Sequence, residues 1–206
     1  MKANPNSLGV CVCDNGYYGD HCETKTVFQK IRDGDPVKIK FLSQDIVNGL
    51  PSNYILQPNT DWYVSLAHIV EGEPNSNNPG MAWDVVSTTT TGDSWPYYYL
   101  KSNNNTVFAC MDQSFSENRD CINPYAWDTR QGWFKIKIVP VGNEKDGKAR
   151  LINKFGESNT NGSGQCYVSV GHGGWSGGPP GDLHVGCPND DMSTSTKSLW
   201  KLISVP

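Results

Sequence analysis

The sequence predicts an all-β fold, and three observations lead to that prediction. Gly and Pro are frequent, at 21 and 13 of 206 residues, which favours turns over long helices. Short segments that alternate apolar and polar residues recur along the chain, as half-buried strands do. No segment carries a convincing helical pattern. Three of the strand-like segments begin at a tryptophan, namely Trp83, Trp133 and Trp200, and we expect these rings to lie in the core.

A fixed order of strand-like segments occurs three times, which indicates an internal repeat. The tryptophan segments are each preceded by a similar strand, at residues 63–68, 107–112 and 167–172. Ahead of these lie shorter strands centred on Leu56, Leu100 and Leu151. Residues 37–43 read like a further tryptophan strand without its tryptophan. The pattern predicts repeats at roughly 36–86, 87–138 and 139–206, behind a small N-terminal module over 1–25.

Three units of about four strands each are similar to a β-trefoil, a closed arrangement without free sheet edges. The resemblance is closest to ricin-B-type trefoil lectins, whose hallmark QxW is present as Gln131-Gly132-Trp133. The other two repeats keep the tryptophan and replace the glutamine by Met81 and Ser198. The resemblance implies that Trp83, Trp133 and Trp200 are related by a pseudo-threefold axis. A β-sandwich is the rival fold, and it would place them on unrelated faces.

Residues 11–22 resemble the second half of an EGF-like module: a CxC pair, a Gly-aromatic turn, a second Gly and a closing Cys. The resemblance implies a Cys13–Cys22 disulfide. Cys11 would pair with an upstream cysteine that this sequence lacks, so a truncated module, an intermolecular disulfide or a spare thiol all remain open. A metal site that uses His21 is the alternative, but the usual CxxC spacing is missing. We therefore expect no metal.

The remaining cysteines flank loops of the second and third repeats. Ricin-type repeats place disulfides similarly, which implies Cys110–Cys121 and Cys166–Cys187. Such cysteine usage is typical of an oxidising compartment, so we expect a secreted, extracellular protein. Glycosylation sequons at Asn104 and Asn161 agree with a glycoprotein.

Composition and motifs exclude several functional classes. The net charge of −4 gives no reason to expect nucleic acid as a partner. No window approaches the ~18 apolar residues of a membrane span, so we expect no membrane insertion. Nucleophile elbows, phosphate loops and metal spacings are missing, and carboxylate pairs such as Glu71 and Glu73 suit solvated loops better than glycoside hydrolysis. We expect a binding protein, not an enzyme, that needs no cofactor.

Carbohydrate binding is the function that the sequence favours, because aromatic rings stack on sugars while Asp, Asn, Gln and His bond their hydroxyls. The trefoil resemblance places such groups in loops. In the second repeat the candidates are Asp112, Asn123, Tyr125, Trp127, Asp128 and Gln131. In the third they are His172, Trp175, Asp182 and Asn189.

The sequence therefore predicts a lectin for a neutral glycan, with glycans or glycoproteins as partners. The alternative is a structural or adhesive matrix protein, or a receptor ligand, that binds no sugar. A role in cell adhesion fits either reading.

Overall fold

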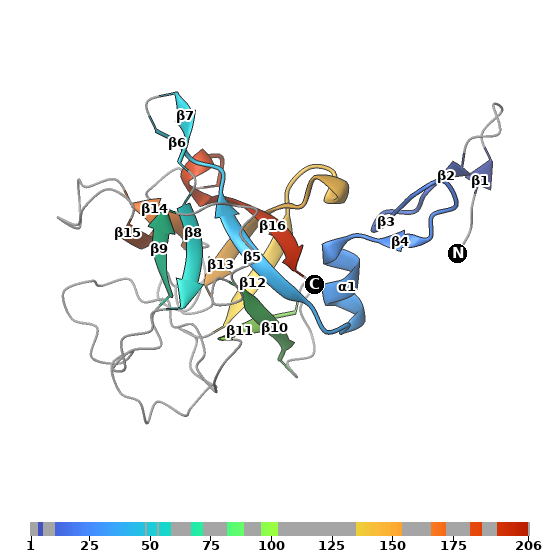
Figure 1. Cartoon of the computed structure of the whole chain (residues 1–206), viewed down its shortest axis with the longest axis horizontal. Helices are drawn as coiled ribbons and strands as arrows, with labels where there is room; N and C mark the ends of the chain where they lie inside the picture. Colours follow the sequence, from blue (N-terminus) through green and yellow to red (C-terminus); the bar gives the residue numbers. More distant parts are fainter. Residues whose placement is uncertain are drawn as a thin grey trace.

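The computed structural model describes residues 4–5, 11–47, 49–52, 54–58, 67–71, 82–88, 96–102, 135–153, 166–171, 182–186 and 193–205. Within these residues six strands close into a barrel (Figure 1). In ring order they are β5 (Lys38–Ser43), β10 (Trp83–Ser87), β11 (Tyr98–Ser102), β12 (Ile136–Pro140), β13 (Lys148–Asn153) and β16 (Leu199–Val205). All neighbours are antiparallel, and β16 returns to β5. The all-β prediction is confirmed, and a closed ring is not the rival two-sheet sandwich.

The described residues include two hairpins that extend from barrel strands. Strands β8 (Tyr54–Pro58) and β9 (Ala67–Glu71) extend from β5, and β14 (Cys166–Gly171) and β15 (Asp182–Gly186) extend from β13. The first and third sets of strands therefore share one plan, in which the outer strands join the barrel and the inner two form the hairpin. Between β5 and β8 lies a smaller hairpin of β6 (Ile46–Val47) and β7 (Leu50–Pro51).

The pairing register reveals a pseudo-threefold relation. A residue on the fourth strand of each set is paired with a residue on its own first strand and with one on the first strand of the next set. The triplets are Trp83 with Ile39 and Ser102, Ile136 with Tyr98 and Asn153, and Trp200 with Ala149 and Ser43. On each first strand, the two positions that take part in these triplets are four residues apart (39 and 43 on β5, 98 and 102 on β11, 149 and 153 on β13). The register therefore supports the trefoil symmetry without any reference to residue type.

The same register shows that the sequence-based triplet of tryptophans is wrong in the second repeat. Ile136, and not Trp133, holds the position of Trp83 and Trp200, and all three described side chains are fully buried. Trp133 itself lies outside the described residues. The smaller side chain of Ile136 is compensated by a larger one on the paired strand. Tyr98 is the residue paired with Ile136, whereas Ile39 and Ala149 are the residues paired with the two tryptophans. The large ring has moved to the neighbouring strand, which preserves packing at native density.

The predicted equivalence of the three leucine strands is also wrong. Leu100 and Leu151 lie on barrel strands β11 and β13, whereas Leu56 lies on the hairpin strand β8. Residues 37–43 contain β5, so Phe41 is the first-set counterpart of those two leucines. Likewise the strand at 167–172 falls on β14, the second of its set, while residues 63–68 run into β9, the third. Alternating strands look alike in sequence, and only their pairing tells first from second.

Hydrogen bonds of the two buried indoles repeat the symmetry. The Trp83 Nε1–H donates to the carbonyl oxygen of Leu56 at 2.9 Å, and the Trp200 Nε1–H donates to that of Val168 at 2.8 Å. Leu56 on β8 and Val168 on β14 thus play the same part in their repeats. Tyr98 differs, because among the described residues its Oη has no hydrogen-bond partner, and burial raises the pKa of its phenol.

One short helix, α1 (Val27–Asp33), contradicts the expectation of a fold without a convincing helix. Thr26 caps it by accepting a hydrogen bond from the Gln29 N–H at 3.2 Å, and the Thr-x-x-Gln spacing is that of a capping box. Gly34 ends it in the left-handed region, with φ 73°. Phe28 and Ile31 are buried in the core cluster, so α1 covers part of the barrel.

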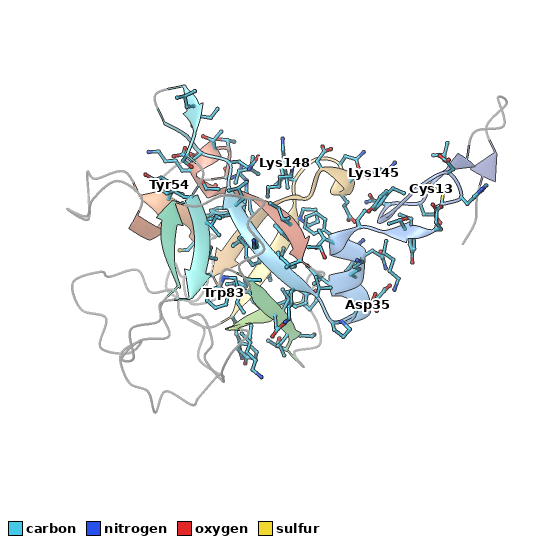
Figure 2. The ribbon with its side chains drawn as sticks, in the orientation of Figure 1. Cys13, Asp35, Tyr54, Trp83, Lys145 and Lys148 are labelled. Carbon is cyan, nitrogen blue, oxygen red and sulfur yellow. A yellow bond between two sulfur atoms is a disulfide. The ribbon has the colours of Figure 1, made fainter. Side chains whose placement is uncertain are left out.

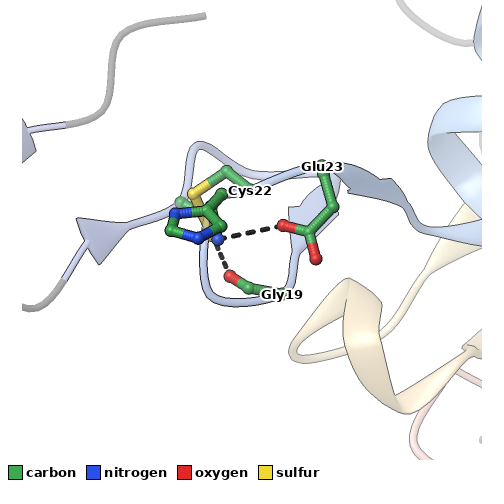
Figure 3. The surroundings of a disulfide bond; sticks show 5 residues. Gly19, Cys22 and Glu23 are labelled. Carbon is green, nitrogen blue, oxygen red and sulfur yellow. Dashed lines mark hydrogen bonds between the residues drawn. A yellow bond between two sulfur atoms is a disulfide. The ribbon is translucent and has the colours of Figure 1, made fainter.

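The N-terminal segment extends from α1 to one side of the barrel (Figure 1). It holds two small hairpins, β1 (Asn4–Pro5) with β2 (Cys11–Val12) and β3 (Tyr17–Tyr18) with β4 (Thr24–Lys25). The predicted Cys13–Cys22 disulfide is present. Beside it the N–H groups of Glu23 and His21 lower the pKa of the Glu23 carboxyl, the latter bond measuring 2.9 Å (Figure 3). The chain here is ordered by the disulfide and local bonds instead of a core.

Candidate functional site

Most of the predicted sugar-binding residues fall outside the part of the chain that the structure describes. In the second repeat these are Asp112, Asn123, Tyr125, Trp127, Asp128 and Gln131, and in the third His172, Trp175 and Asn189. For Asp182 the structure describes the backbone but not the side chain. Asp182 begins β15 and pairs with Gly171 at the end of β14. The structure therefore does not test whether these groups converge.

The described strands do fix where the two predicted segments attach. Residues 103–134 connect β11 to β12, which are antiparallel neighbours in the barrel through Tyr98 and Ile136. Residues 172–181 connect the hairpin strands β14 and β15. Each segment thus connects two strands that are paired in the described structure.

Only part of the predicted covalent framework can be followed. Cys166 is disulfide-bonded, and its predicted partner Cys187 lies outside the described residues, as do Cys110 and Cys121. The sequons at Asn104 and Asn161 also lie outside them, and the partner of Cys11 stays a prediction.

No group of three or more His, Cys, Asp or Glu within the described residues is placed to hold a metal ion. None of the described helices is long and apolar enough to span a membrane.

The described residues form a cleft between the N-terminal segment and the barrel. Its volume is about 210 Å³, and its walls come from β3, β4, α1, β16 and the 3-10 helix η3 (Glu144–Asp146). A second 3-10 helix, η4 (Thr196–Ser198), precedes β16 and does not line this cleft. Figure 2 labels Lys145, which lines the cleft. We call this space the lysine cleft, after Lys25, Lys30, Lys145 and Lys201 in its lining.

A polar latch joins α1 to the barrel beside the cleft. The Arg32 guanidinium donates two hydrogen bonds to the Glu144 carboxylate, at 2.7 and 2.8 Å, and Thr26 Oγ1 donates a third at 3.3 Å. Arg32 also donates to Gln29 Oε1 at 2.8 Å. The Glu144 side chain is only 5% exposed and that of Arg32 is 27% exposed. A buried carboxylate is tolerated here because both of its oxygens are satisfied.

Gly16 brings the N-terminal hairpin against this latch. The Thr26 N–H donates to the Gly16 carbonyl oxygen at 2.8 Å. Gly16 has φ 96°, and a Cβ added there would lie 2.5 Å from Gln29 Oε1 and 2.8 Å from Arg32 Nη2. Glycine is therefore required at this position both for its backbone angle and for close approach.

We expect Gly16→Ala to lower the free energy of unfolding by about 1–3 kcal/mol, from backbone strain and from displacement of the latch. Gly34→Ala is the matched control, since Gly34 also has a positive φ, of 73°, but an added Cβ would meet nothing within 4 Å. Urea denaturation of both variants separates the two effects. Equal losses would show that the hairpin does not press on the latch.

The charges of the lysine cleft are unevenly neutralised. Ion pairs with Asp33 and Asp35, at 2.7 and 2.9 Å, raise the pKa of Lys25. The same contact lowers the pKa of Asp33. No carboxylate among the described residues forms an ion pair with Lys30, Lys145 or Lys201. The cleft therefore presents uncompensated positive charge in a chain whose net charge is −4.

Sequence reasoning did not identify this cleft. The capping box at Thr26 and Gln29 was a usable signal for α1. No sequence signal linked Lys30, Lys145 and Lys201, because they come from α1, η3 and β16, which lie far apart in the chain.

Comparisons with known proteins indicate the fold and nothing finer. No family model matches the chain, and no curated protein matches it. A solved structure described as "BEL beta-trefoil apo crystal form 3" is similar, with a TM-score of 0.52 and 15% sequence identity. The match covers 82% of this chain and 93% of that one. At that identity the likeness supports a β-trefoil fold, in agreement with the register of the barrel.

Proposed function

We propose that this protein is an extracellular lectin that binds a neutral glycan through its second repeat. One observation carries the proposal: the six-stranded barrel closes without residues 103–134. That segment holds Asn123, Tyr125, Trp127 and Asp128. A role of these side chains in ligand binding is therefore compatible with closure of the barrel.

The chemistry of the segment suits a sugar. A ring of Tyr125 or Trp127 stacks on the apolar face of a pyranose, while Asp128 and Asn123 accept or donate hydrogen bonds to adjacent hydroxyls. Gln131, in the QxW that resembles ricin-B-type lectins, lies a few residues on. The third repeat offers His172 and Trp175 as a second, weaker set. The Cys13–Cys22 disulfide supports an oxidising, extracellular setting. We propose binding without catalysis.

A glycan array followed by calorimetry tests this function. Trp127→Ala should weaken binding by about 0.5–1.5 kcal/mol beyond the burial of the ring. Asp128→Ala should cost about 1–3 kcal/mol through unpaired partners. Both variants should keep the parent's melting temperature, since the barrel closes without this segment.

Trp175→Ala is the control. If it alone abolishes binding while Trp127→Ala and Asp128→Ala bind like the parent, the third repeat holds the site. If the folded parent binds no neutral glycan on the array, the lectin proposal is wrong.

A further inference from the structure

The lysine cleft gathers cations from three separate elements. Lys30 comes from α1, Lys145 from η3 and Lys201 from β16, and all three line the same 210 Å³ space. Lys145 and Lys201 are exposed, so their ammonium groups are available to a ligand. Two carboxylates, Glu144 and Asp146, also line the cleft. Glu144 is paired with Arg32, so Asp146 is the remaining carboxylate of the lining against these three lysines.

A second observation is independent of the cleft's shape. Lys201 on β16 is paired directly across from Lys148 on β13. Like charges at directly opposite positions of an antiparallel pair repel and destabilise it. Neither lysine has an ion-pair partner among the described residues. An anion between the two ammonium groups would convert this repulsion into two charge-assisted contacts.

The cleft also has an aromatic wall. Tyr18 on β3 lines it, and 42% of its surface is exposed. An exposed ring beside cations is suited to a ligand with both an apolar face and a negative charge. An acidic sugar has both, because its C–H face stacks on the ring while its acid group meets the ammonium groups.

We propose that the lysine cleft binds an acidic polysaccharide, with a sulfate or carboxylate held by Lys145 and Lys201 and a sugar ring on Tyr18. Lys148 does not line the cleft, but it adds positive charge from the position opposite Lys201. This proposal uses none of the residues of the proposed neutral-glycan site and does not depend on it. The N-terminal segment supplies one wall, so it takes part in recognition. The latch of Arg32 and Glu144 holds that wall in place.

The test measures binding of dextran sulfate, carboxymethyl dextran and unmodified dextran to the full chain by calorimetry. The parent should bind one or both acidic polymers, with affinity that falls as NaCl is raised. Stronger binding of the first assigns a sulfate to the cleft, and stronger binding of the second assigns a carboxylate. The double variant Lys145→Gln/Lys201→Gln should lose about tenfold or more in affinity, since it removes two charge-assisted contacts.

Lys101→Gln is the matched control. It removes the same kind of charge from β11, which lies across the barrel from β16 in the ring order, and it should change affinity by less than about twofold because the position is remote. Tyr18→Ala should weaken polymer binding by about threefold or more through loss of ring stacking. Trp127→Ala should leave it unchanged, which separates this proposal from the lectin function.

Several results would overturn the proposal. They are equal binding of unmodified dextran, no binding of either acidic polymer, or the same loss in Lys101→Gln as in the double variant. If Tyr18→Ala binds like the parent, or poly-glutamate binds as well as the acidic polymers, the ligand is not a saccharide.

Discussion

Trp200→Ala will lower the free energy of unfolding by about 3–5 kcal/mol, as expected for a large ring removed from a close-packed core. Trp200 is fully buried, and its Nε1–H donates to the carbonyl oxygen of Val168. The variant therefore leaves a cavity and loses the hydrogen bond of the indole to that carbonyl oxygen. Denaturant titration followed by circular dichroism gives the value. Tyr18→Ala, at an exposed site, should stay within about 0.5 kcal/mol of the parent.

The pseudo-threefold register itself is tested by exchanging a pair between repeats. In the second repeat Tyr98 faces Ile136, whereas in the third Ala149 faces Trp200. Tyr98→Ala alone should cost about 3–5 kcal/mol through a cavity. Ile136→Trp alone should cost about 1–3 kcal/mol through overpacking.

The double variant Tyr98→Ala/Ile136→Trp rebuilds the pair of the third repeat. We expect its loss to be smaller than the sum of the single losses by at least about 1 kcal/mol, because the new indole fills the space of the lost phenol. The Tyr98 hydroxyl lacks a hydrogen-bond partner among the described residues, so its removal also reduces the loss of stability in the double variant. Strictly additive losses would show that the two positions are not equivalent to Ala149 and Trp200.

Arg32→Ala will destabilise the protein by about 3 kcal/mol, near the lower end for a broken buried ion pair, because it leaves the Glu144 carboxylate uncompensated. Glu144 is almost fully buried, while the partial exposure of Arg32 lets water replace part of what is lost. The loss should depend little on NaCl, as buried pairs are weakly screened. Urea denaturation at low and high NaCl measures both effects.

Two further variants define the cause. Lys30→Ala removes a cation from the same helix without breaking a described ion pair, and should change stability by less than about 0.5 kcal/mol. Arg32→Met/Glu144→Leu replaces both partners by apolar side chains and should recover most of the loss. A double variant as unstable as Arg32→Ala would mean that packing, and not the stranded charge, is responsible.

Sequence patterns were sufficient wherever the signal is local. Alternation of apolar and polar residues located β5, β13, β14 and β16, and the burial of Trp83 and Trp200 followed from their place at the start of apolar strands. The resemblance of residues 11–22 to half of an EGF-like module implied the Cys13–Cys22 disulfide, which is present. Each of these depends on neighbours along the chain, which the sequence displays directly.

Of the two candidate binding sites, one was predicted from the sequence and the other became visible only in the structure. The second-repeat group around Trp127 was proposed from sequence and attaches to strands that are paired in the barrel. The lysine cleft could not be proposed from sequence, since Lys148 and Lys201 meet only across β13 and β16. Nothing local to either lysine indicates the other.

By itself, the sequence determined that this chain folds into strands, in three related sets, with tryptophans in the core. Only the tertiary structure decided which residue fills each symmetric position. A barrel requires a total side-chain volume at each level, and that volume can be supplied from either of two facing strands. Ile136 with Tyr98 meets the requirement as Trp200 with Ala149 does, so the tryptophan pattern fails at Trp133. The latch also depends on the tertiary structure, because Arg32 and Glu144 are separated by 112 residues along the chain and form their ion pair only once α1 lies against the barrel.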